Sequence, residues 1–209
     1  MAKPNNDLAS RNRVLSTQRA LIVYSLSAAV LTLLRIHFGA VQLHILSDRL
    51  PWFELMHGFT VLGDGAFALI IVLWLFLKKS NRSIWIVFLV GFTLASLMPQ
   101  LGKLLWPEAA RPHAVIEGLR FSTLFDPAYY RSFPSGHSSL GAFFALFLAY
   151  RKPQWVWIYL IFGVLIGLSR IILHYHWTED VIAGWAIGLG AAWFAERILG
   201  NKIENYGIT

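Results

Sequence analysis

Three short groups of polar residues could carry chemistry in this otherwise apolar chain of 209 residues. They are Lys103 with Arg111-Pro112, Pro134-Ser135-Gly136-His137, and Ser169-Arg170 followed by His176 and Asp180. Ionisable side chains at membrane depth are costly, so such residues are candidates for function. A single Lys or Arg more often extends its cationic head to lipid headgroups. Three groups in one chain instead favour a common site.

The tetrapeptide Pro134-Ser135-Gly136-His137 has the properties of an anion cradle. Ser and Gly allow close approach of the backbone where the N-terminus of a helix presents free N–H groups to an anion. An ordinary helix cap would account for the Ser and the Gly. It would not explain why a histidine follows at position 137.

His176 and Asp180 are four residues apart, a spacing that puts both on one face of a helix. A carboxylate there can keep one imidazole nitrogen protonated and leave the other free to attack. The guanidinium of Arg170 suits bidentate contact with phosphate oxygens. A metal site formed by His174, His176 and Asp180 is an alternative interpretation, disfavoured by the neighbouring cations.

The composition is that of an integral membrane protein. Hydrophobic residues make up 56% of the chain, charged residues only 14%, and the mean hydropathy is +0.56. Soluble proteins carry about 25% charged residues. With no cysteine, the chain has neither a disulfide nor a thiolate ligand or nucleophile.

The elements that must position these residues are apolar runs close to the length that crosses a membrane. We predict an all-α bundle of six transmembrane helices forming a single domain over residues 1–209, because continuous apolar runs do not alternate as barrel strands do. The predicted spans are Leu21–Gly39, Phe59–Leu77, Ile84–Leu101, Ser138–Tyr150 with extensions, Gln154–Leu173 and Val181–Leu199. Residues 1–18 are expected as a polar arm or surface helix, and residues 102–133 as a long extracytoplasmic loop.

The distribution of charge predicts the orientation. Six spans put both termini on one side, which then carries eleven bases and three acids, against seven bases and eight acids on the other. The positive-inside rule makes the base-rich side cytoplasmic. The net charge of +7 therefore indicates insertion topology rather than nucleic-acid binding, and the three polar groups fall on the extracytoplasmic side.

Together the three groups resemble the three-part signature of the type 2 phosphatidic acid phosphatase (PAP2) superfamily. The second and third groups match its pattern fully. The first has seven residues between Lys103 and Arg111, where the family has six, and one of them is Pro107. The match is therefore firmer at Arg111 than at Lys103.

The resemblance implies a metal-independent lipid phosphatase that needs no cofactor. His176 would attack phosphorus, Asp180 would orient it, and His137 would protonate the leaving oxygen. The phosphoryl oxygens would be held by Lys103, Arg111, Ser135, Gly136 and Arg170.

The implied partners are the lipid bilayer and a phosphorylated membrane lipid, with no nucleic acid. Undecaprenyl diphosphate, phosphatidylglycerol phosphate, phosphatidic acid and a lipid A phosphate are the substrate types that the resemblance suggests. The implied location is the plasma (inner) membrane, with the site facing the periplasm. Two alternatives stay open, a lipid phosphotransferase of the same family and a small membrane transporter. The hydrophobic spans argue against a soluble haloperoxidase relative.

Overall fold

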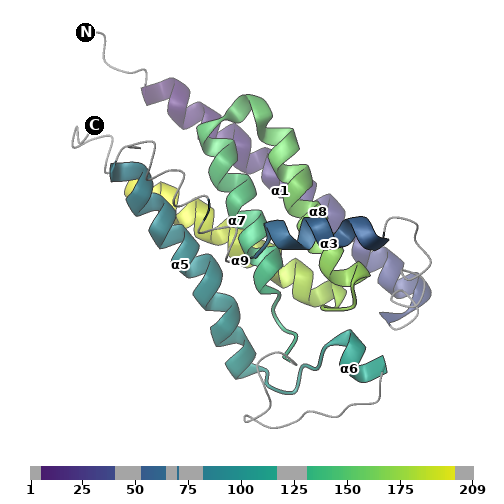
Figure 1. Cartoon of the computed structure of the whole chain (residues 1–209). Helices are drawn as coiled ribbons and strands as arrows, with labels where there is room; N and C mark the ends of the chain where they lie inside the picture. Colours follow the sequence, from purple (N-terminus) through teal and green to yellow (C-terminus); the bar gives the residue numbers. More distant parts are fainter. Residues whose placement is uncertain (1–5, 41–52, 65–69, 71–81, 117–130, 201–209) are drawn as a thin grey trace.

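The structure is a computed structural model that describes residues 6–40, 53–64, 70, 82–116 and 131–200 (Figure 1). Within these residues every regular element is helical, so the all-α prediction is confirmed for this part of the chain. The elements are α1 (Asn6–Phe38), α3 (Phe53–Leu62), α5 (Arg82–Leu105), α6 (Pro112–Ile116), α7 (Gly136–Arg151), the 3-10 turn η1 (Pro153–Trp155), α8 (Val156–Ile172), α9 (Thr178–Ala195) and the π-helical turn η2 (Glu196–Gly200).

Four helical segments of the described chain are long and apolar enough to cross a membrane. They are Ser10–Phe38, Ile84–Leu105, Pro153–Ile172 and Thr178–Leu199. At about 1.5 Å of rise per residue, each reaches roughly the 30 Å of a hydrocarbon core. They correspond to the first, third, fifth and sixth predicted spans.

The fourth predicted span is helix α7, and it lies inside the bundle. α7 has 16 residues, of which eleven are buried, and it packs against α5, α8 and α9. Its apolar side chains therefore pack mainly against protein. α3 begins at Phe53, earlier than the second predicted span, and most of that span lies outside the described residues. A count of six spans therefore stays a prediction.

Two segments expected outside the transmembrane spans contain helix. Residues 6–18 form the first turns of α1, where Ser16 Oγ donates to Ala149 O and Arg13 pairs with Glu196 at 3.5 Å. These contacts hold the polar residues against α7 and η2. In the expected 102–133 loop, α5 continues to Leu105 and α6 forms a short helix, while residues 117–130 lie outside the description.

Close packing of α7 against α9 depends on two glycines. A Cβ at Gly184 would collide with Ser135 O, and one at Gly188 would collide with Ser139 O. Gly190 on the same helix differs, because nothing lies within 4 Å of a Cβ built there. Small residues permit such approach of helices in membranes.

Aromatic packing holds α5 against α7. The ring of Phe88 lies 5.2 Å from that of Phe147 and 5.7 Å from that of Phe143, measured between centroids. All three rings are buried. This contact orients α5, whose last turn carries Lys103.

Candidate active site

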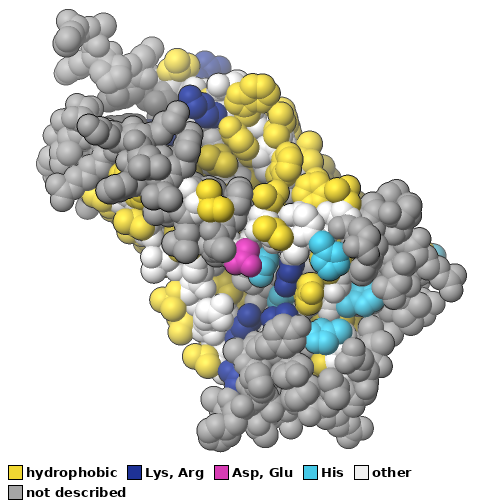
Figure 2. Space-filling model, in the orientation of Figure 1, with side chains coloured by type: hydrophobic (Ala, Val, Ile, Leu, Met, Phe, Trp, Pro, Cys, Tyr) yellow, Lys and Arg dark blue, Asp and Glu magenta, His cyan; other side chains and the backbone are white. Residues whose placement is uncertain are grey.

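The predicted site residues come from several elements that meet at one end of the bundle (Figure 1). Lys103 lies in the last turn of α5, Arg111 just before α6, and Arg170 in the last turn of α8. The remaining members are at the start of α7, in the 173–177 connection, and in the first turn of α9. Figure 2 shows basic side chains and histidines gathered in one region of the visible face.

A tight reversal between α8 and α9 places His176. The backbone N–H groups of Tyr175 and His176 both donate to Arg170 O, each at 3.0 Å. His174 has a φ of 58°, in the left-handed region that non-glycine residues seldom adopt. The turn buries the side chain of His176 to 1% exposure beside the end of α8.

Asp180 and Ser132 face Nδ1 of His176. Asp180 Oδ2 lies 3.4 Å from that nitrogen, and Ser132 Oγ lies at the same distance. Ser132 Oγ also donates a hydrogen bond to Asp180 Oδ2. Two oxygen atoms at Nδ1 favour the tautomer with the proton there, which leaves Nε2 as the unprotonated nitrogen.

Asp180 also has a structural task. Its Oδ2 accepts from the backbone N–H of Trp177 at 2.8 Å, which caps the first turn of α9. Its backbone oxygen accepts from Ser135 N at 3.0 Å. The same residue therefore ties the start of α9 to the start of α7.

The start of α7 has the form expected of an anion cradle. Ser135 is the N-cap, and its Oγ accepts from Ser138 N at 3.3 Å and from Ser138 Oγ at 2.8 Å. Next to it, Gly136 faces open space, with nothing within 4 Å of a built Cβ. Free N–H groups and the positive end of a helix dipole attract an anion to such a place.

Three buried cations surround His176. Lys103, Arg111 and Arg170 are 8%, 7% and 6% exposed. Burial lowers the pKa of His176 well below its ordinary value, and the charges of these three residues lower it further. His176 is therefore neutral in the free protein at neutral pH, as a nucleophile must be.

Two contacts orient Arg170. Its Nη1 donates to Thr60 Oγ1 of α3, and its guanidinium lies 4.3 Å from the ring centroid of Tyr175. A guanidinium held by a hydrogen bond and by a ring face has a restricted geometry. α3 thus contributes to the site although no predicted site residue belongs to it.

His137 lies in the first turn of α7 and interacts electrostatically with His176 and Arg170. The backbone of Gly63 packs against it, since a Cβ at Gly63 would lie 3.2 Å from His137 Cβ. Asp64, next in the chain, also interacts electrostatically with His137. The two histidines are therefore members of one charged cluster.

Ser132, Thr60 and Arg131 were not among the residues singled out from the sequence. Ser132 is fully buried, and Arg131, at 5% exposure, accepts through its backbone oxygen from Arg111 Nε at 3.4 Å. Ser132 and Arg131 immediately precede the 133–137 segment, and their burial becomes visible only in the fold. Nothing in the apolar sequence around Thr60 marks it.

The alternative metal site is not assembled. Among the described residues no three His, Cys, Asp or Glu side chains come together as metal ligands. His174 uses its backbone oxygen to accept from His113 N at 3.3 Å. The close partners of His176 are instead Asp180 and Ser132.

A cavity of about 410 Å³ reaches Asp180 from the surface. Trp106, Phe133 and Trp177 line it, and the rings of Trp106 and Phe133 meet edge to face at 5.3 Å. Aromatic side chains are typical of the interface between membrane and water. The cavity therefore suits a molecule with a polar headgroup and an apolar body.

Comparisons with known proteins agree with this geometry. A family model described as the PAP2 superfamily matches residues 85–204. The undecaprenyl-diphosphatase of Sulfolobus acidocaldarius is 30% identical over 64% of this chain and 61% of its own length. The lipid A 1-phosphatase of Rhizobium johnstonii is 32% identical, over 68% and 63%. The chain thus spans less than two thirds of either protein.

Two further comparisons, one of sequence and one of structure, match Bacillus subtilis phosphatases over more of their length. Phosphatidylglycerophosphatase B is 30% identical over 76% of this chain and 80% of its own. The crystal structure of a transmembrane PAP2 type phosphatidylglycerolphosphate phosphatase superposes with a TM-score of 0.60 at 24% identity. That superposition covers 90% of this chain and 97% of the other, and it shows a shared fold.

Proposed function

Because the chain belongs to the PAP2 superfamily, we propose that it is a metal-independent lipid phosphatase that works through a phosphohistidine on His176. The observation that carries the proposal is the environment of His176: two oxygen atoms face Nδ1, and three buried cations lie around the ring. Phosphoryl transfer depends mainly on placement and on stabilisation of charge. Both are available in this cluster.

In the first step, Nε2 of His176 attacks phosphorus in line with the leaving oxygen. Asp180 and Ser132 hold the Nδ1 proton and stabilise the positive charge that develops on the ring. His137 takes up a proton when the anionic phosphate binds; the P–O bond then breaks, and His137 gives that proton to the departing oxygen. The alcohol, or the lipid monophosphate when the substrate is a diphosphate, then leaves.

In the second step, water attacks the phosphohistidine. His137 now accepts the proton of that water, in the reverse of its earlier role. The N–P bond breaks, phosphate leaves, and His176 is neutral again. Lys103, Arg111, Arg170, the Ser135 hydroxyl and the Gly136 N–H bind the equatorial oxygens in both steps.

The proposed substrate is a phosphate or diphosphate monoester on a lipid, such as undecaprenyl diphosphate, phosphatidylglycerol phosphate, phosphatidic acid or lipid A. The aromatic cavity beside Asp180 supports a lipid at the membrane boundary.

With the base-rich termini in the cytoplasm, the site opens on the periplasmic side of the plasma membrane. A cysteine introduced at Glu117 would then be labelled from outside the cell, and labelling only from the cytoplasm would reverse this topology.

Phosphate release by the detergent-purified protein from these four lipid phosphates tests the proposal. We expect release in the presence of a chelator, inhibition by vanadate, and loss of turnover in His176→Ala, with His174→Ala as the matched control. Vanadate resembles the trigonal-bipyramidal transition state and should bind more tightly than phosphate. If a chelator stops turnover and Zn²⁺ or Mg²⁺ restores it, the mechanism fails. Transfer of the phosphoryl group to a second lipid without phosphate release would identify a phosphotransferase.

A further inference from the structure

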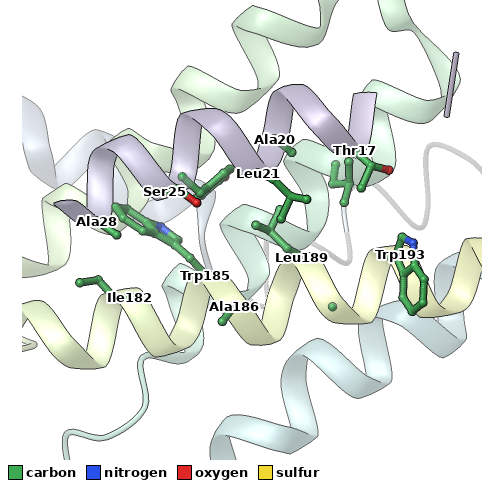
Figure 3. Close-up of a pocket in the computed structure, with 13 residues that line it drawn as sticks. Thr17, Ala20, Leu21, Ser25, Ala28, Ile182, Trp185, Ala186, Leu189 and Trp193 are labelled. Atoms are coloured by element: carbon green, nitrogen blue, oxygen red, sulfur yellow. The ribbon is translucent and has the colours of Figure 1, made fainter. Parts of the chain in front are cut away.

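An apolar groove runs between α1 and α9 on the side of the bundle shown in Figure 3. Its volume is about 440 Å³, and it extends from Thr17 to Ala28 on α1 and from Trp193 to Ile182 on α9. Eleven residues of helix correspond to about 16 Å. This is about half of the ~30 Å hydrocarbon core, the depth of one leaflet. Leu21, which lines the groove, is 54% exposed.

At the end farther from the active site the groove joins a small polar pocket of about 110 Å³. Thr17 and Trp193 line both, so the two spaces are neighbours. Ser10, Arg13, Tyr150, Glu196 and Arg197 complete most of the polar wall. An apolar channel that ends in a polar pocket has the form of a site for a lipid with its headgroup.

The charge of the polar pocket selects the kind of headgroup. Arg13 and Arg151 share the single carboxylate of Glu196, at 3.5 and 2.5 Å. Arg197 also lines the pocket. Among the described side chains that line the pocket, two guanidinium groups accompany one carboxylate, and Arg151 pairs with that same carboxylate from beside the pocket, so positive charge is in excess. Guanidinium groups bind phosphate oxygens well.

We propose that this groove and pocket bind an anionic phospholipid, with its phosphate beside Arg13 and Arg197 and one acyl chain between α1 and α9. Free phosphate would leave the groove unused, and a lipid without net charge would not match the excess positive charge of the pocket. The headgroup pocket lies at the opposite end of the bundle from His176, so the phosphate bound there is not the one being hydrolysed. On the proposed topology it belongs to the cytoplasmic leaflet.

Native mass spectrometry of the detergent-purified full chain can test the site. The probes are phosphatidylglycerol and phosphatidylcholine with identical acyl chains. We expect wild-type protein to retain phosphatidylglycerol in preference to phosphatidylcholine. Arg197→Gln and Arg13→Gln should each weaken retention about fivefold, the usual effect of one basic residue near an anionic headgroup. Ala186→Trp, at an exposed groove position, should displace the acyl chain.

Arg11→Gln is the matched control, because Arg11 lies on the same end of α1, is exposed, and does not line the pocket. If Arg11→Gln weakens retention as much as Arg197→Gln, only general surface charge attracts the lipid and the proposal is wrong. Equal retention of both lipids by wild type would also overturn it. So would a dimer that Ala186→Trp dissociates, because a second copy would then occupy the groove. Arg13→Gln removes an ion pair with Glu196 and could unfold the protein. In that case the result for Arg197→Gln decides the test.

Discussion

Asp180 Oδ2 lies 3.4 Å from His176 Nδ1, one helical turn away in sequence. The same oxygen accepts from the backbone N–H of Trp177, so one carboxylate both orients an imidazole and caps α9. The second task gives Asp180 a structural reason to be buried, independent of the reaction. Only the first task concerns the reaction, and substitution can separate the two.

Asp180→Asn should keep the fold and lose most activity. An asparagine oxygen can still accept from Trp177, but the neutral amide cannot stabilise a positively charged His176 ring. We expect kcat to fall by about 10³ to 10⁴, as for the comparable substitution in other triads, with Tm nearly unchanged. Asp180→Ala should lower both. Glu179→Gln is the control in the same helical turn: Glu179 lines the aromatic cavity but pairs with Arg35 and not with His176, so this variant should keep far more activity than Asp180→Asn.

Gly136→Ala should fold normally and be impaired in catalysis. Nothing lies within 4 Å of the new methyl group, and alanine favours a helix over glycine by about 1 kcal/mol. The methyl group would, however, occupy the space proposed for a phosphoryl oxygen. We expect a drop on the order of 10² in kcat/KM, by analogy with the loss of an oxyanion donor.

Gly190→Ala provides the comparison, because that position is also open but lies on α9 away from the site. It should leave both kcat/KM and Tm close to wild type. Equal activity of the two alanine variants would remove Gly136 from the proposed cradle.

Arg111→Ala should cost more than Lys103→Ala. The first motif has an extra residue, and of the two charges that of Arg111 acts more strongly on His176. Loss of one direct oxyanion contact costs roughly 10² to 10³ in rate, and we expect that range for Arg111 and a smaller loss for Lys103. Lys152→Ala, at the other end of α7, controls for loss of positive charge. Equal losses at the two site positions would show that both cations contact the phosphoryl group equally.

The acid limb of the pH profile should report the environment of His176. Burial and the three cations disfavour the protonated ring, so its pKa lies well below 6.5 and the nucleophile stays neutral in mildly acidic solution. Protonation would inactivate the nucleophile, so kcat/KM falls as pH drops through that pKa. Arg170→Gln removes one of the charges that lower the pKa and should therefore move the acid limb to higher pH. The substrate's own ionisation is the same for both proteins, so an unmoved limb would assign it to the substrate.

Local patterns predicted much of this architecture and site. Hydropathy located α1, α5, α8 and α9, because lipid-facing helices need long apolar runs. The four-residue spacing predicted the pairing of His176 with Asp180. Motif resemblance indicated the remaining polar residues that gather around them.

Long-range contacts could not be predicted in the same way. The hydrogen bond between Ser132 and Asp180 joins residues 48 positions apart in sequence, and that between Arg170 and Thr60 joins residues 110 positions apart. Neither residue belongs to a local pattern. The continuation of α1 to Asn6 similarly depends on partners in α7 and η2, such as Ala149 and Glu196. These features come from tertiary packing, which single-sequence periodicity does not encode.

Direct detection of the phosphoenzyme tests the central claim most sharply. The protein is mixed with a lipid phosphate substrate and quenched in alkali, under which phosphohistidine survives. Fragmentation of the 170–180 segment by mass spectrometry then distinguishes His176 from His174. We predict a phosphoryl group on His176 in wild type, its accumulation when substitution of His137 slows hydrolysis, and none in His176→Ala. A phosphoryl group on any other residue, or continued turnover by folded His176→Ala, would contradict the account.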